Sequence, residues 1–499
     1  MSCRHRAFDC YEDSPKTVAM EQMSLHFREN AARALADPQL QRALGNVKTG
    51  FILKRAAARA ALPEFDALRD EATAIKTHVI DHLDIYLEEY ERRVLASGGH
   101  VHWARDAAEA RDIVLAICRE AGAKTVTKGK SMVSEEIGLN AALEAANIRP
   151  VETDLGEYII QLRRETPSHI IAPAVHLNRD QIEGDFRAAH VDLPPERDLS
   201  QIVELVGEAR TVLRQQFLAA DVGITGANFL IAETGSSVIV TNEGNGDLTQ
   251  LLPRTHIVIA SLEKLVPTLE DASTILRVLA RSATGQEMTS YTTFSTGPRR
   301  DDDPDGPDAY HVVLLDNGRS EMLGTEFQDM LRCIRCGACL NHCPVYAAVG
   351  GHAYGSVYPG PMGAVLTPQL TGIHDAAHLP NASTFCGRCQ AVCPMHIPLP
   401  KMMRHWRERD FAAQSALATP KLAIRAWAWF ARRPGFYRFA TAAQGRLLSL
   451  LPRSILAKLP LGKGWTPYRV LPKPAPRPFL AQWQAREQEK LRRERPRHG

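Results

Sequence analysis

The sequence lacks the segments that would place it across or beyond a membrane. No stretch of about 18 consecutive apolar residues occurs, so we expect no membrane-spanning helix. The first residues, Met1 to Cys10, contain no apolar core of a secretory signal, which predicts a cytoplasmic protein. Disulfides are rare in that compartment, so the ten cysteines indicate metal or redox chemistry.

Cofactor and nucleic-acid motifs are also missing. The chain has no flavin or nicotinamide fingerprint and no P-loop. Its net charge of +3 is uneven: residues 401–499 contain 22 Lys and Arg against 5 Asp and Glu, a net charge of +17 that leaves −14 on the first 400 residues. Without a nucleic-acid-binding module, this asymmetry predicts contact with acidic partner proteins or peripheral contact with an anionic membrane at its inner face.

Seven of the ten cysteines lie within one short stretch. The first run has the spacing C-x2-C-x2-C-x3-C-P and is formed by Cys333, Cys336, Cys339 and Cys343. The second run has the spacing C-x2-C-x3-C-P, one cysteine fewer, and is formed by Cys386, Cys389 and Cys393. Two zinc sites are the alternative, but this spacing suits tetrahedral zinc poorly and is typical of iron–sulfur proteins.

The spacing also predicts how the ligands are shared. In two-cluster ferredoxins the fourth cysteine of each run ligates the other cluster. The first cluster would then be held by Cys333, Cys336, Cys339 and Cys393. The second would be held by Cys343, Cys386 and Cys389, which leaves it one cysteine short.

Three explanations of that deficit stay open. The second cluster is 3Fe–4S, or it is 4Fe–4S with a non-cysteine ligand or an open iron, or it is completed by Cys3, Cys10 or Cys118. We favour the 4Fe–4S form with an atypical fourth position. His342 and His396 lie nearby in sequence, but we interpret each as a surface or supporting group.

The remaining chain alternates between helical and extended patterns. Helices are expected over residues 1–65, 75–97, 106–120, 134–146 and 271–282. Extended segments are expected at residues 101–103, 124–127, 150–153, 159–162, 169–172, 228–232, 237–241, 255–260 and 311–315, with loops at 292–308 and 346–367. This alternation predicts an α/β domain with a largely parallel sheet.

The motifs together resemble the lactate utilization protein B family. The two cysteine runs and Gly360–Pro368 between them resemble its iron–sulfur region. Five segments resemble the LUD domain of that family, namely Lys128–Met132, Glu152–Tyr158, Pro167–His169, Thr225–Asn228 and Glu233–Ser236. Gly464–Thr466 resembles the family's C-terminal extension. The resemblance covers roughly residues 25–485.

The resemblance implies a fold and a function. A helical lead (1–65) would precede an α/β LUD domain (66–320) with the fold of sugar-phosphate isomerases and CoA transferases. An all-α helical ferredoxin domain with two 4Fe–4S clusters (321–410) and a basic extension (411–499) would follow. The protein would act with two other lactate-utilization proteins to oxidise L-lactate to pyruvate, supporting growth on lactate. Seven cysteines are also the family's number.

Candidate residues in the LUD domain carry weaker signals. Lys128–Ser131, between a strand and a helix, could hold an anion or form a solvated basic turn. Glu233 could act as a base or nucleophile, although we favour a carboxylate that caps backbone N–H groups. Four further side chains could line one cleft, with ordinary hydrogen bonds favoured over a metal site: Asp154, Glu157, His169 and His176.

These features favour an electron-transfer subunit of a lactate-oxidising complex, with an unknown electron acceptor. The alternative is a self-sufficient iron–sulfur oxidoreductase that binds an organic acid in the LUD domain. A third class is a structural or redox-sensing protein. For the aromatic residues near the basic C-terminus we favour packing against the ferredoxin domain over a membrane-interface helix; they are Trp427, Trp429, Phe430, Phe436 and Tyr437.

Overall fold

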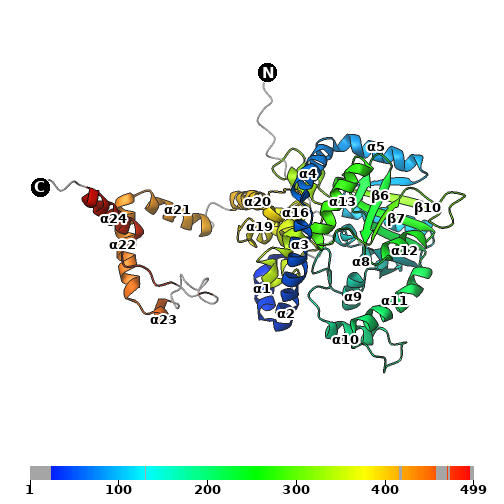
Figure 1. The fold of residues 1–499 in the computed structure, drawn as a ribbon, viewed down its shortest axis with the longest axis horizontal. Coiled ribbons are helices and arrows are strands. Elements are labelled where there is room, and N and C mark those ends of the chain that lie inside the picture. The colour runs from blue at the N-terminus through cyan, green and yellow to red at the C-terminus, as the bar shows by residue number, and fades with distance from the viewer. Residues whose placement is uncertain (1–23, 130, 415–418, 457–468, 470–471, 495–499) are drawn as a thin grey trace, which may run out of the picture. The chain divides into compact units, whose positions relative to one another are not determined.

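A computed structural model describes residues 24–129, 131–414, 419–456, 469 and 472–494 (Figure 1). The chain divides into two compact units, residues 1–412 and 413–499. Cys3, Cys10, Lys130 and Gly464–Thr466 lie outside the described residues. The described part of the N-terminal lead is helical, as predicted; its elements are η1 (Ser24–His26), α1 (Phe27–Ala36), α2 (Pro38–Val47), η2 (Lys48–Ile52) and α3 (Leu53–Ala60).

A six-stranded parallel sheet forms the centre of the larger unit, which confirms the predicted α/β class. Its order is β1-β10-β7-β4-β2-β3. The strands are β1 (His100–Ala104), β2 (Thr125–Gly129), β3 (Arg149–Glu152), β4 (Val222–Gly226), β7 (Thr255–Ser261) and β10 (Ala309–Leu315). The central strands are buried on both faces, which explains their continuous apolar sequence.

Helices cover both faces of this sheet (Figure 1). Ile257 and Ile259 of β7 pack with α6 (Ala107–Glu120) and α8 (Leu139–Ala145). Val258 and Ala260, which point the other way, pack with α4 (Phe65–Asp81) and α5 (Leu83–Ala96). Other helices of this region are α7 (Met132–Glu136), α9 (Leu155–Arg163), α10 (Arg179–Ala189), α11 (Ile202–Leu218) and α12 (Asn245–Leu251).

A second, smaller sheet has the order β8-β5-β6-β9. Its strands are β8 (Leu265–Val266), β5 (Phe229–Ile231), β6 (Ser236–Thr241) and β9 (Tyr291–Ser295), and α13 (Leu269–Ala283) packs on it. The prediction of a loop at 292–308 was therefore wrong for residues 292–295, which belong to β9. β9 is a partly exposed edge strand without apolar alternation, and its pairing with β6 gives it its conformation.

Four further sequence predictions need correction. Residues 159–162 are helical, because the Asp154 side chain accepts the Gly156 and Glu157 N–H groups and starts α9. Residues 169–172 form no strand. The helix expected at 134–146 is interrupted at Gly138, which has a φ of +64°. The helix expected at 75–97 is interrupted at His82, so that α4 and α5 are separate helices.

The fully described span 316–413 contains helices and loops but no strand. Its elements are η4 (Ser320–Met322), η5 (Gln328–Arg332), α14 (Ala338–Asn341), α15 (Tyr346–Val349), η6 (His352–Tyr354), α16 (Gly360–Thr371), α17 (Ile373–Ala376), α18 (His378–Asn381), α19 (Arg388–Val392) and α20 (Leu399–Ala413). The expected loop around the cysteines thus includes the buried helix α16. This region shares one apolar core with α4, α13 and the second sheet.

The described residues of the smaller unit include four helices. Its helices are α21 (Thr419–Ala431), α22 (Pro434–Leu450), α23 (Arg453–Leu456) and α24 (Phe479–Glu494). Trp429 packs edge-on to Phe430 and Phe436, and the Arg433 guanidinium lies 3.9 Å from the Trp429 ring centroid. In the described part of the chain, every helix is too short or too polar to cross a bilayer.

Candidate iron–sulfur site and the adjoining cavity

The structure brings the seven cysteines together in two neighbouring groups. One cavity is lined by four of them: Cys333, Cys336, Cys339 and Cys393. Apolar side chains that include Ile334, Met362 and Ile397 form its remaining walls. The first three cysteines come from the segment around α14, whereas Cys393 follows α19 more than 50 residues later. The geometry thus places the last cysteine of the second run with the first run.

The electrostatic surroundings of the thiols follow the same grouping. Burial, and next the neighbouring Cys393, raises the pKa of Cys336 to about 12. Burial, and next the neighbouring Cys343, raises the pKa of Cys389 to about 12. Without a metal these thiols are therefore neutral at physiological pH. Iron would bind them as thiolates and displace their protons, as metal ligation of cysteine requires.

The second group lies closer to the surface. Cys343 and Cys389 are buried, whereas Cys386 is exposed to solvent. Cys339 of the first group also interacts electrostatically with Cys389, so the two groups are neighbours. The donor set fits soft iron centres, with four sulfurs around the first position and three around the second.

Three of the candidates for the missing ligand lie among the described residues, and no described contact brings any of these three to a thiol; Cys3 and Cys10 lie outside the described residues. His342 Nδ1 lies 2.9 Å from the Ala338 carbonyl oxygen, and His396 Nε2 lies 3.0 Å from an Asp70 carboxylate oxygen. Cys118 is packed in the core between α6 and the large sheet, away from the other cysteines, so it does not complete the second group. Burial raises its pKa to about 12, as expected of an inert core thiol.

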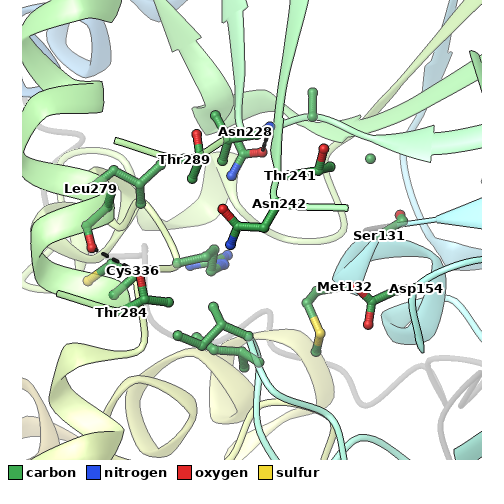
Figure 2. A pocket seen from close by; sticks show the side chains of 18 of the residues that line it. Ser131, Met132, Asp154, Asn228, Thr241, Asn242, Leu279, Thr284, Thr289 and Cys336 are labelled. Atoms are coloured by element: carbon green, nitrogen blue, oxygen red, sulfur yellow. Dashed lines mark hydrogen bonds between the residues drawn. The ribbon is translucent and has the colours of Figure 1, made fainter. Parts of the chain in front are cut away.

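A second cavity adjoins the first cysteine group (Figure 2). Cys336, Leu279 and Thr284 lie on one side of it, and Ser131 and Asp154 lie on the opposite side. Several lining residues follow the carboxyl ends of parallel strands, namely Ser131 after β2, Asp154 after β3, Ala227 and Asn228 after β4, and Lys264 after β7. Ligands of open α/β sheets commonly bind at this edge.

A buried ion network connects the sheet to the cysteine region. Arg319 pairs with Glu136 at 2.6 Å and with Glu263 at 3.1 Å. Glu263 also pairs with Arg335, which lies between Cys333 and Cys336 in the sequence. Burial raises the pKa of Glu263, but Arg319 and Arg335 outweigh it and hold that pKa at about 2. The carboxylates are therefore ionised at neutral pH.

The LUD-domain candidates are distributed differently from the sequence expectation. Lys128 is neither an anion site nor a solvated turn: it is buried and pairs with Glu135 at 2.6 Å and Glu152 at 2.7 Å. The sequence could not show this, because Glu152 comes from a neighbouring strand. The Glu233 carboxylate accepts a hydrogen bond from the Leu269 N–H at the start of α13. This agrees with the predicted capping role, but the capped N–H group belongs to a helix and not to the turn that contains Glu233.

The four residues expected in one cleft are separated. Asp154 and Glu157 line the cavity beside Cys336. His169 is buried against the cysteine region, where its Nε2 lies 2.9 Å from Asn341 Oδ1, and burial lowers its pKa to about 4. His176 belongs to a separate cluster with Glu165 and His352. In it, His176 Nε2 lies 2.8 Å from Glu165 Oε2.

Lys264 and Arg335 line this cavity but were not predicted from the sequence. A usable signal existed for Lys264, since the polar pair Glu263-Lys264 ends an apolar strand at the edge where α/β sheets bind ligands.

Comparisons with known proteins agree with this architecture. Family models match a LUD domain at residues 87–315, a 4Fe-4S dicluster domain at 329–397 and a lactate utilisation protein B C-terminal region at 401–488. Lactate utilization protein B from Shouchella clausii is 43% identical over 469 residues, 93% of this chain and 97% of the relative. The chain belongs to the lactate utilization protein B family.

Other members of this lactate utilization protein B family are similarly close. The protein of that name from Oceanobacillus iheyensis is 42% identical and covers 93% of this chain and 96% of its own length. The protein of that name from Geobacillus thermodenitrificans is 46% identical and covers 83% of this chain and 87% of its own length. A solved DUF162 family structure from Deinococcus radiodurans aligns with 47% of this chain and 98% of its own, with 16% identity and a TM-score of 0.24, too low to bear on the fold.

Proposed function

We propose that this chain carries electrons through two iron–sulfur clusters, as a subunit of a complex that oxidises L-lactate to pyruvate during growth on lactate. The observation that carries the proposal is the pair of neighbouring cysteine groups in a chain that matches a 4Fe-4S dicluster domain. Relatives named lactate utilization protein B support the choice of lactate. The other subunits are two further lactate-utilization proteins.

The ligands proposed for each cluster follow the two groups. Cys333, Cys336, Cys339 and Cys393 hold one 4Fe–4S cluster, and Cys343, Cys386 and Cys389 hold the second. The second cluster is a 4Fe–4S centre with a non-cysteine fourth position, and a 3Fe–4S centre is the alternative. When bound, each cluster supplies a centre that accepts and returns one electron.

Side chains around the cysteines affect the reduction potential of the first cluster and the solvent exposure of the second. Lys264 and Arg335 both place positive charge near Cys333. Positive charge stabilises the reduced, more negative state of an iron–sulfur site and raises its potential. Cys386 lies at the surface, so the second group is the natural exchange point with a partner.

A basic hollow near Cys386 fits an acidic partner protein. It is lined by Phe385, Lys401, Arg404, Arg407 and Phe411, among others, and the Arg407 guanidinium lies 4.1 Å from the Phe385 ring centroid. Positive charge there would steer an acidic electron-transfer partner to the second group. The basic extension, 411–499, is proposed to add docking to acidic partners or peripheral contact with an anionic membrane.

Finer assignments of the fold belong to the same proposal. The LUD domain would share the fold of sugar-phosphate isomerases and CoA transferases, and the cysteine region would be an all-α helical ferredoxin domain. The parallel order β1-β10-β7-β4-β2-β3 and the strand-free span 316–413 support these assignments.

Ligand replacement tests the function. Cys336→Ser and Cys389→Ser should each lower the iron content by about half from about eight irons per anaerobically purified chain, and each should abolish growth on L-lactate. Cys118→Ala, which removes a buried cysteine outside both groups, should retain iron and growth. Unchanged growth in both serine variants would contradict the proposal.

The self-sufficient oxidoreductase is the second candidate, and the cavity beside Cys336 favours it. It requires lactate turnover by the purified chain with an artificial electron acceptor and no partner. A purely structural role for the clusters requires that they resist reversible reduction, which an EPR redox titration measures.

A further inference from the structure

Lys264 is a buried cation without a counter-charge in contact. It follows β7 within the short helix η3 (Leu262–Lys264), and only 7% of its surface is exposed. Among the described residues its Nζ has no hydrogen-bond or ion-pair partner, although it lines the cavity beside Cys336. The nearby buried Lys76, in contrast, donates to the carbonyl oxygens of Glu263 and Leu265. Because this ammonium faces the cavity and pairs with no described protein group, a ligand in the cavity that supplies negative charge would stabilise it.

The neighbours of Lys264 increase this preference for an anion. Burial, and next the nearby Arg335, lowers the pKa of Lys264 to about 8, against the smaller opposing effect of Glu263. Lys264 is therefore largely protonated at neutral pH. The carboxylate of Glu263 is already shared by Arg319 and Arg335, so it does not neutralise Lys264 as well.

The cavity has the size and lining of a small-molecule site. Its volume of about 170 Å³ suits a molecule of a few heavy atoms rather than a nucleotide. Neutral hydrogen-bonding groups face it from Asn228, Thr241, Asn242 and Thr284, and Asn242 is exposed, so the cavity opens to solvent there (Figure 2).

The cations of the lining favour a single negative charge on the ligand. Arg335 also lines the cavity, but it already pairs with Glu263 at 3.0 Å, which leaves Lys264 as the cation available to a ligand among the described lining residues. A monocarboxylate needs one cation and neutral donors, whereas the second negative charge of a phosphate would lack a partner there.

We infer that this cavity binds a small monocarboxylic acid of the 2-hydroxy or 2-oxo class, with its carboxylate against Lys264 Nζ and its second oxygen among the amide and hydroxyl groups. The acid then lies in a cavity whose wall includes Cys336. The choice of this acid class rests on the proposed function, while the anion site itself rests on Lys264 and the cavity.

Calorimetric titration of the anaerobically purified full chain tests the inference, with pyruvate as the probe and inorganic phosphate as the comparison. Saturable pyruvate binding is expected, with affinity at least tenfold weaker in Lys264→Met and largely kept in Lys264→Arg. Lys124→Met is the matched control, because Lys124 is exposed at the amino end of β2, the opposite edge of the sheet. Iron content should stay unchanged in all three variants.

Several outcomes would overturn the inference: no pyruvate binding by the parent chain, equal binding by Lys264→Met, or phosphate binding in place of pyruvate. If the variants fold poorly, acetylation of Lys264 in the parent chain, followed by mass spectrometry, replaces them. Pyruvate should slow that modification, and an unchanged rate would count against the site. Because these measurements need no partner or electron transfer, their failure differs from failure of the growth test on the cysteine variants.

Discussion

Arg319 and Glu136 form an ion pair in which both side chains are almost fully buried. Arg319 Nη2 lies 2.6 Å from Glu136 Oε2, and Nη1 lies 2.9 Å from Oε1. The Tyr358 hydroxyl donates to the same carboxylate at 2.7 Å. Helix α7 of the α/β region, the segment after β10 and the cysteine region are therefore joined at one charged group.

Breaking this pair should destabilise the chain strongly. Arg319→Met leaves the carboxylates of Glu136 and Glu263 buried without their cation, so we expect a loss of about 3–5 kcal/mol in the free energy of unfolding by urea. The double variant Glu136→Gln/Arg319→Met should recover part of it. Arg92→Met, which breaks an exposed pair with Glu89, should lower the free energy of unfolding far less. Similar costs for the buried and exposed pairs would contradict this account.

Gly351 marks a backbone contact between the α/β region and the cysteine region. A Cβ atom at this position would lie 1.7 Å from the Ser168 carbonyl oxygen, so Gly351→Ala should force the two segments apart. We expect a loss of about 1–3 kcal/mol or more in unfolding free energy, together with lower iron content. Gly207→Ala, at an exposed position of α11 with open space around it, should instead add about 0.5–1 kcal/mol. Equal effects of the two substitutions would show that the contact is not close.

His256 should make the stability of the fold depend on pH. It is buried in β7, its Nε2 lies 2.9 Å from Thr225 Oγ1, and burial lowers its pKa to about 3. Between pH 6.5 and 3 the unfolded chain binds a proton that the folded chain does not, so stability falls as the pH falls. This histidine should cost about 2 kcal/mol between pH 7 and 5.

Urea unfolding at several pH values measures the effect of His256. His256→Gln keeps a hydrogen-bonding side chain but does not titrate, so its stability should fall less steeply with pH than that of the parent chain. Identical slopes for the two proteins would refute the assignment to His256, since His169 and His311 are present in both.

Local patterns in the sequence were sufficient for much of the fold. Strands of the large sheet, such as Thr255–Ser261, are long apolar segments bounded by turns, and the Asp106 side chain caps α6 where the helix was predicted to start. Segments 159–162 and 169–172 were mistaken because a short apolar run does not distinguish strand from helix or loop. The helix after Asp154 depends on a cap, and the 169–172 segment is fixed by contacts of His169 with Asn341, 172 residues away.

The sequence by itself determined the iron–sulfur chemistry expected of this protein, because cysteine spacing and the following prolines are local features of the chain. Tertiary structure alone decided what surrounds the thiols. Lys264, Arg319 and Arg335 come from separate segments and meet only when the parallel sheet and the cysteine region share one core. Their burial sets the charge beside Cys336 and leaves Lys264 facing a cavity, because the cost of burying a charge depends on neighbours that are distant in the sequence.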